Sequence, residues 1–274
     1  MTFSVWDGVL VAAVATQATV LAYIYRPRWK ALMLNLPIPF TLATLALGRR
    51  VDVTNVAGLV VLLGFTYAVW LLHGRRRWNI ALSIVLSASG YCVVGGALAY
   101  LLTGAGDAAF WIGAALAVAL AAVLFLGVPP REEPGHRSPL PVWIKLPTIV
   151  AVVGVLVAIK QVLGGFMTVF PMVGVVAAYE ARRSLRTICR QIPVIILSMT
   201  PMMVLVRYAE PGLGRGGALA AGWAALLGIL IPLMRWQWRR EARTAVALAE
   251  GAPPPRTGRP GASPAPVDTP SRKG

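Results

Sequence analysis

KQVLGGFMTVFPMVGVVAAYEARR, residues 160–183, is apolar and long enough to cross a bilayer, yet it is broken in the middle. Gly164 and Gly165 lie near its start, and Pro171 lies at its centre. A proline inside a helix removes one backbone donor and displaces the carbonyl four residues back, here that of Met167. In hydrocarbon, such a freed carbonyl needs a partner within the protein or in a water-lined cavity.

A second broken segment precedes it, at residues 26–50, RPRWKALMLNLPIPFTLATLALGRR, with Asn35, Pro37 and Pro39 near its centre. An offset of 134 residues places Pro37 on Pro171. The same offset gives three further identities and one basic pair: Met33 with Met167, Ala43 with Ala177, Arg49 with Arg183, and Arg26 with Lys160. Paired interrupted spans in matching halves indicate a transporter's substrate site. Two ordinary proline-kinked membrane helices remain the alternative, because Pro and Gly are common there.

The composition is that of a membrane protein. Apolar residues make up 57% of the chain and charged residues 13%, and the mean hydropathy is +0.70. The net charge of +16 reflects basic loops and few acids, so we expect anionic lipid headgroups at the cytoplasmic face as partners, and no nucleic acid. The two cysteines show neither metal spacing nor a disulfide framework.

Apolar runs predict nine transmembrane helices. They cover about 4–25, 31–48, 54–73, 79–103, 108–127, 141–159, 162–180, 189–207 and 212–234. The N-terminus lacks a basic leader and a cleavage site, so we expect the first span to be retained.

Charge counting predicts the orientation. With the N-terminus outside, sixteen basic residues fall in inner loops and five in outer loops. The inner ones are Arg26, Arg28, Lys30, Arg75, Arg76, Arg77, Arg131, Arg137, Arg182, Arg183, Arg186, Arg190, Arg235, Arg239, Arg240 and Arg243; the outer ones are Arg49, Arg50, Lys160, Arg207 and Arg215. We therefore expect a multi-pass protein of the bacterial inner membrane, with its N-terminus outside and its C-terminus in the cytoplasm.

The repeat predicts how the chain is organised. Residues 1–250 form one transmembrane domain, in which a four-helix unit at about 4–103 is joined by a linker helix at 108–127 to a second unit at about 141–234. Five spans separate matching helices, so the units are inverted; a parallel repeat, pairing spans two to five with six to nine, remains the alternative. Residues 235–250 carry Trp236 and Trp238 and are expected at the interface. The Pro/Gly-rich residues 251–274 are expected to be a disordered cytoplasmic tail.

Residues 164–210 resemble GlpM and related small four-span bacterial membrane proteins. The likeness rests on a pair of small residues, Phe170-Pro171, Tyr179-Glu180, and a following helix with Pro193 and Pro201. It implies that this chain is a fused pair of such units, the first half being a more diverged copy. Since the family has no well-established reaction, the resemblance bears on fold more than on function.

The sequence lacks the motifs of an enzyme. It has no HExxH, CxxC or P-loop, and no acid lies at the centre of a span. We therefore expect no catalysis, no metal and no cofactor. The leading function is a carrier or flippase for a small neutral, amphipathic or anionic solute. The alternative is a non-catalytic membrane subunit that scaffolds a partner enzyme, and a homo-oligomer or a membrane partner is compatible with both.

The candidate binding residues surround the two breaks: Asn35, Pro37, Pro39, Lys160, Gln161, Gly164, Gly165, Thr168 and Pro171. Asn35 and Thr168 either bind substrate or bond neighbouring helices. Lys160 and Gln161 either receive an anionic group at the outer mouth or form an exposed turn. Glu180 and Arg183 are candidate gating residues, the alternative being a helix-end carboxylate paired with arginines.

Overall fold

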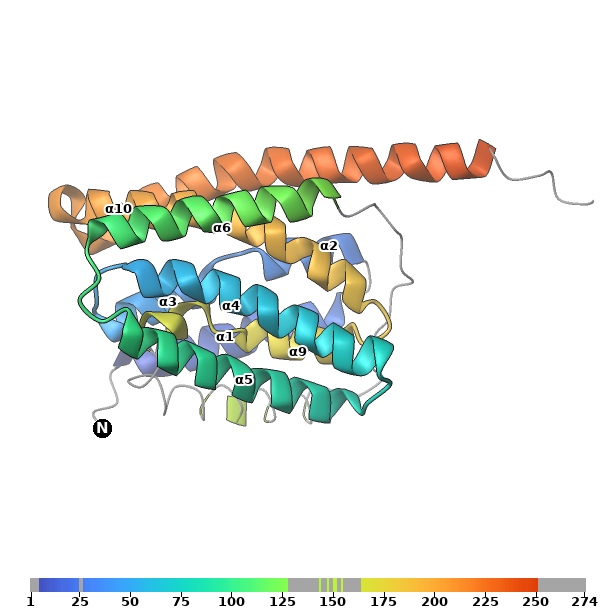
Figure 1. Cartoon of the computed structure of the whole chain (residues 1–274), viewed down its shortest axis with the longest axis horizontal. Coiled ribbons are helices and arrows are strands. Elements are labelled where there is room, and N and C mark those ends of the chain that lie inside the picture. Colours follow the sequence, from blue (N-terminus) through green and yellow to red (C-terminus); the bar gives the residue numbers. More distant parts are fainter. Residues whose placement is uncertain are drawn as a thin grey trace, which may run out of the picture.

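The computed structural model describes residues 5–24, 27–127 and 164–250, together with isolated helical positions at 143, 147, 150, 151 and 154. Every regular element in these ranges is a helix, and the helices lie roughly side by side in a bundle (Figure 1). Lys160, Gln161 and most of the expected span 141–159 lie outside the described residues.

The helices follow the expected apolar runs closely. They are α1 (Val5–Tyr23), α2 (Pro27–Leu34), α3 (Ile38–Leu47), α4 (Val53–Val69) continued by the π-helical turn η1 (Trp70–Arg75), α5 (Ile80–Leu101), α6 (Asp107–Gly127), the 3₁₀ segment η2 (Gly164–Val169), α9 (Met172–Glu180) and α10 (Leu185–Glu250). The two expected broken spans are each divided, into α2 with α3 and into η2 with α9.

In the part of the chain that the structure describes, four helices are long and apolar enough to cross a membrane: Val53–Arg75, Ile80–Leu101, Asp107–Gly127 and Leu185–Arg240. At 1.5 Å per residue, the 22 residues of α5 span about 33 Å, which matches a hydrocarbon core of about 30 Å. These helices, with the shorter apolar ones, confirm the prediction of an all-α membrane protein. The count of nine spans and the repeat stay predictions.

The long α10 is a helical hairpin. Gly214 has φ 66° and ψ 169°, which no helix contains, and the chain doubles back there (Figure 1). The expected spans 189–207 and 212–234 are its two legs. The legs approach closely at Gly222, where an added Cβ would lie 2.7 Å from Val206 Cγ2. Residues 235–250 continue the second leg as helix. Trp236 and Trp238 still pack against Phe125 and Trp29, and the last turns extend beyond the rest of the bundle (Figure 1).

The loops gather at two ends of the bundle. Pole A contains residues 48–52, 102–106 and 207–216, which hydrogen bonds tie together: Arg215 Nη2 donates to Gly48 O at 3.0 Å, and Arg50 Nη2 donates to Arg207 O at 3.0 Å. Pole B contains residues 75–80 and 181–184 at the opposite end (Figure 1). Among the described residues, the loops that charge counting assigned to one side of the membrane therefore lie together.

The outer faces of α5 and α6 suit a lipid environment. Their large apolar side chains are exposed: Leu82, Val85, Val93, Leu116 and Val123. Exposed tryptophans lie near helix ends, Trp6 and Trp111 toward pole A and Trp29 and Trp78 toward pole B. Aromatic belts of this kind are typical of the two membrane–water interfaces.

Candidate functional site

The two broken segments break at the aligned prolines and in the same way. Pro37 precedes α3 with φ −82° and ψ 35°, and Pro171 precedes α9 with φ −72° and ψ 49°. Each proline carbonyl accepts the first bond of its helix, from Thr41 N at 2.9 Å and from Val175 N at 2.7 Å, which again are 134 residues apart. The offset found in the sequence therefore coincides with a shared local conformation.

The two segments cross in opposite directions. α2 packs against α9, while α3 packs against η2, so the first half of each segment meets the second half of the other. In Figure 1, the chain runs from α2 toward α3 on the left, and from η2 near α3 back toward α9. An antiparallel pair of this kind is the arrangement that an inverted repeat requires.

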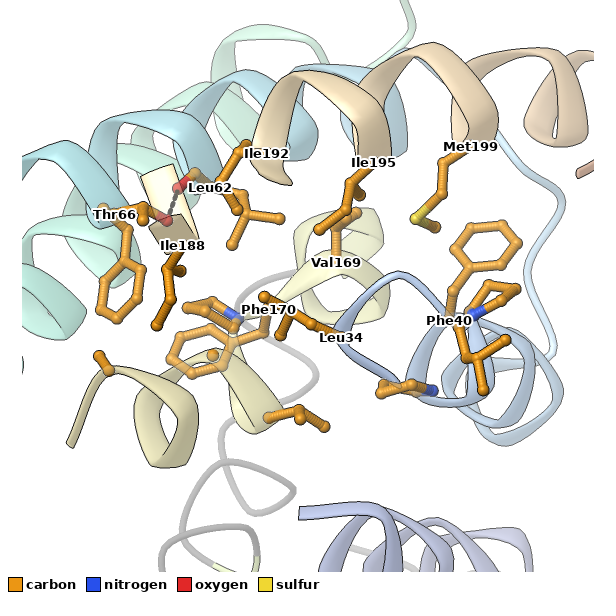
Figure 2. Close-up of a pocket in the computed structure, with 18 of the residues that line it drawn as sticks. Leu34, Phe40, Leu62, Thr66, Val169, Phe170, Ile188, Ile192, Ile195 and Met199 are labelled. Carbon is orange, nitrogen blue, oxygen red and sulfur yellow. Dashed lines mark hydrogen bonds between the residues drawn. The ribbon is translucent and has the colours of Figure 1, made fainter. Parts of the chain in front are cut away.

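A cavity lies where the segments cross (Figure 2). The volume open to the centre of a water molecule is about 70 Å³. Its walls come from both broken segments and from α4 and α10: Leu34, Leu36, Pro37, Pro39, Phe40, Leu62, Phe65, Thr66, Val69, Thr168, Val169, Phe170, Pro171, Val173, Gly174, Ala178, Leu185, Ile188, Ile192, Ile195 and Met199. One water needs roughly 10–15 Å³ by this measure, so the cavity has room for several waters or a short apolar group.

The cavity is apolar apart from two hydroxyls, those of Thr66 and Thr168. Thr66 Oγ1 donates to Leu62 O at 2.9 Å within its own helix, the bond drawn in Figure 2. Thr168 Oγ1 donates to Gly165 O at 2.7 Å. Both hydroxyls are committed to the protein, so the walls offer a solute chiefly apolar contact.

Gln17 of α1 satisfies the carbonyls at the first break. Its Nε2 donates to Met33 O at 2.8 Å and more weakly to Leu36 O at 3.4 Å. Met33 O is the carbonyl that Pro37 was expected to free. Gln17 is only 4% exposed, so its amide makes these bonds in the interior of the bundle, where water does not reach the carbonyls.

At the second break, α4 and α5 supply the partners. Asn55 Nδ2 donates to Gly165 O at 3.2 Å and to Thr168 Oγ1 at 2.8 Å. Tyr91 Oη donates to Phe166 O at 3.0 Å. The carbonyl of Met167, which Pro171 was expected to free, accepts from Phe170 N at 3.3 Å within the segment.

Each break also contacts the other half of the chain. Asn55 of the first half bonds the second break, as above. Conversely, Asn35 Nδ2 at the first break approaches Gln191 Oε1 of α10 at 3.4 Å and Met234 Sδ at 3.5 Å. Asn35 is 1% exposed, and its Oδ1 accepts no hydrogen bond from the residues that the structure describes.

Only some of the expected site residues line the central cavity. Pro37, Pro39, Thr168 and Pro171 line the cavity. Asn35 is turned toward α10 and does not line it.

The remaining expected residues lie elsewhere. Gly164 begins η2, and Gly165 lines a separate hollow at pole A. The candidate gate residues differ in burial: Glu180, the last residue of α9, is 2% exposed, whereas Arg183 is exposed. Lys160 and Gln161, as noted, are not described.

Sequence reasoning missed the residues that stabilise the breaks: Gln17, Asn55, Tyr91 and Gln191. For Gln17, Asn55 and Gln191, the available signal was an amide side chain in or beside an apolar span, which must find a partner inside the membrane. Asn55 carried a second signal, since Asp52 three residues earlier forms a capping box with it at the start of α4.

Comparisons with protein-family models, with curated proteins and with solved structures give no significant match. The resemblance to GlpM therefore stays a prediction. Among the described residues, no three His, Cys, Asp or Glu side chains cluster as a metal site would require.

Proposed function

We propose that this protein is an inner-membrane carrier or flippase for a small amphipathic or anionic solute, and that the solute binds between the two broken helices. The observation that supports this is the shared cavity: it lies at the crossing of two segments whose helices both restart at Pro37 and Pro171. Broken, antiparallel helices facing each other at the centre of a bundle are the usual setting of a transporter's substrate site.

The chemistry of the cavity narrows the solute class. No acid lines it, so nothing there would neutralise a cation. Apolar walls favour a solute with an apolar body. The cavity is far smaller than the roughly 300–1,000 Å³ of ordinary ligand pockets, so on this proposal the structure corresponds to an occluded state, and transport requires the two units to move apart.

A scaffolding role remains the second candidate because of one feature. The second leg of α10 carries Arg235, Arg239, Arg240 and Arg243 near its end, and its last turns extend beyond the bundle as helix. A basic helix of this kind offers a docking surface for a partner or for anionic lipid. Such a role requires no water access to the cavity.

Cysteine accessibility separates the two roles. In a background lacking Cys92 and Cys189, Ile195→Cys places one thiol on the cavity wall (Figure 2). Val93→Cys, on the exposed apolar face of α5, is the matched control. A membrane-impermeant thiol reagent is applied to right-side-out and to inside-out vesicles.

If the protein is a carrier, Ile195→Cys should react from both sides of the membrane. Val93→Cys should stay unreactive because it faces lipid. Reaction of Ile195→Cys from neither side, or from one side only, contradicts the carrier. Reaction from neither side favours the scaffold.

A further inference from the structure

Pole A contains a second and larger hollow. Its volume, by the same measure, is about 420 Å³. It lies between the loop before α4, the end of α5 and the start of η2, and its lining is Arg49, Asp52, Val53, Thr54, Gly96, Ala99, Tyr100, Leu102, Thr103, Gly104, Ala105 and Gly165. Unlike the central cavity, it includes charged side chains and has room for a headgroup.

Among the residues that the structure describes, Arg49 is the cation of this hollow that remains available. The other arginines of pole A are engaged: Arg50 donates to a carbonyl, Arg207 pairs with Asp107, and Arg215 pairs with Glu210 at 2.9 Å. No ion pair or hydrogen bond links Arg49 to the residues that the structure describes.

Asp52 is an acid that lines the hollow, and one of its carboxylate oxygens caps the start of α4. Its Oδ1 accepts from Thr54 N at 2.8 Å and from Thr54 Oγ1 at 2.5 Å, as the cap of α4. This oxygen therefore serves the helix start, and no ion pair joins Asp52 to Arg49 among the described residues. A free guanidinium beside such a hollow favours carboxylate or phosphate, which it binds through two parallel bonds.

The hollow and the central cavity share a wall. Gly165 lines the first and Thr168 the second, and Asn55 donates to Gly165 O and Thr168 Oγ1. Thr168 lies three positions after Gly165, which is one 3₁₀ turn, about 6 Å at roughly 2 Å per residue. A molecule with its anionic group in the hollow therefore has its apolar part about one turn from the cavity.

We propose that the pole A hollow binds the anionic group of an amphipathic solute through Arg49, and that the apolar part of the solute enters the central cavity when the Asn55–Thr168 bond opens. This inference rests on the proposed carrier function and names the solute class: an apolar chain or ring bearing a carboxylate or a phosphate.

Charge-selective labelling tests the role of Arg49. Ala99→Cys, in the background without native cysteines, places a half-buried thiol on the wall of the hollow. Its reaction is timed with an anionic and a cationic methanethiosulfonate of similar size. We expect the ratio of anionic to cationic rate to fall about tenfold in Arg49→Gln, to persist in Arg49→Lys, and to weaken at high salt. Arg50→Gln, a neighbour outside the hollow with its own partner, is the matched control and should change the ratio little.

Protection of the same thiol identifies the ligand. In neutral liposomes, octanoate should slow labelling of Ala99→Cys several-fold more than octanol or inorganic phosphate does. Protection by phosphatidylglycerol in the bilayer, without octanoate, would assign the anion to a lipid headgroup, whereas protection by octanoate alone would assign it to a soluble amphipath. Either result supports the proposal if the protection is lost in the Arg49→Gln variant.

Three outcomes would overturn it: no protection by octanoate or phosphatidylglycerol, equal protection in Arg49→Gln, or equal protection by octanol or phosphate. The carrier is judged separately, by access to Ile195→Cys. A hollow that selects anions in a protein whose cavity never opens would reject the carrier while leaving anion binding standing.

Discussion

Asn55 Nδ2 and Thr168 Oγ1 lie 2.8 Å apart, joining residues 113 positions distant in the chain at a buried point between α4 and η2. The bond holds the second broken segment against the first half of the protein. Asn55 also donates to Gly165 O, so it bonds one residue that lines the polar hollow at pole A and one that lines the apolar central cavity. This hydrogen bond should therefore contribute to the stability of the protein, and on our proposal it must open before the solute enters the central cavity.

Thr168→Val should lower the melting temperature of the protein in detergent. The change keeps the shape of the side chain but removes an acceptor for Asn55 and a donor for Gly165 O, which costs about 1–3 kcal/mol for buried groups. Thr168→Ser should be close to wild type. Thr66→Val is the matched control, since its hydroxyl lines the same cavity but bonds only its own helix. An equal loss in Thr66→Val would contradict a special role for Thr168.

Gln17→Leu should destabilise the protein by about 1–3 kcal/mol, because it leaves Met33 O without its shortest hydrogen bond in the interior. The second variant is Pro37→Ala, which restores a backbone donor near that carbonyl. Melting temperatures of both single variants and the double variant form a cycle. We expect Gln17→Leu to cost less in the Pro37→Ala background. Strict additivity would show that Gln17 does not serve the carbonyl at the break.

Gly165→Ala should not fold normally. A Cβ at this position would lie 2.0 Å from Thr54 Oγ1 and 3.1 Å from Asn55 Oδ1, and both neighbours are fixed by the cap of α4. Gly96→Ala, at a helical position with nothing within 4 Å of the added Cβ, should be tolerated. Yield and monodispersity on size-exclusion chromatography report the difference. A monodisperse Gly165→Ala protein with wild-type melting would show that the segment can shift away from α4.

The antiparallel crossing predicts which cysteine pairs can be joined. Leu34→Cys with Ala178→Cys should be bridged by a short cross-linker, because both line the cavity and α2 packs against α9. Ala43→Cys with Ala177→Cys, the aligned pair that a parallel arrangement would bring together, should not be bridged. The chain is cleaved by a protease between the two positions, and a bridged protein then still migrates as one full-length band on a gel. The reverse pattern would exclude the crossing.

The orientation of the poles can be tested with two single cysteines. Gly106→Cys, in a loop at pole A, should be labelled from outside intact cells, and Gly258→Cys only after permeabilisation. The expectation follows from the excess of basic residues in the loops assigned to the cytoplasm. Labelling of Gly258→Cys in intact cells would reverse or refute this topology.

The sequence by itself determined where the helices lie and where they break. Helix formation in an apolar chain depends on local composition and length, so α4, α5 and α6 match the expected spans within a few residues. The breaks are also local, since a proline removes its own donor wherever the chain is placed. For that reason Pro37 and Pro171 could be identified as the points where the two spans break before any contact was known; the structure shows that a new helix starts after each of them.

Only the tertiary structure decided which groups the breaks meet. Gln17 reaches a carbonyl 16 residues away, whereas Asn55 and Tyr91 bridge 110 and 75 residues. Such partners depend on the rotation and register of packed helices, which apolar patterning leaves undetermined. The same reason separates Arg49 from Arg50: the two are adjacent and chemically identical, but packing gives Arg50 the carbonyl of α10 and leaves Arg49 beside the hollow.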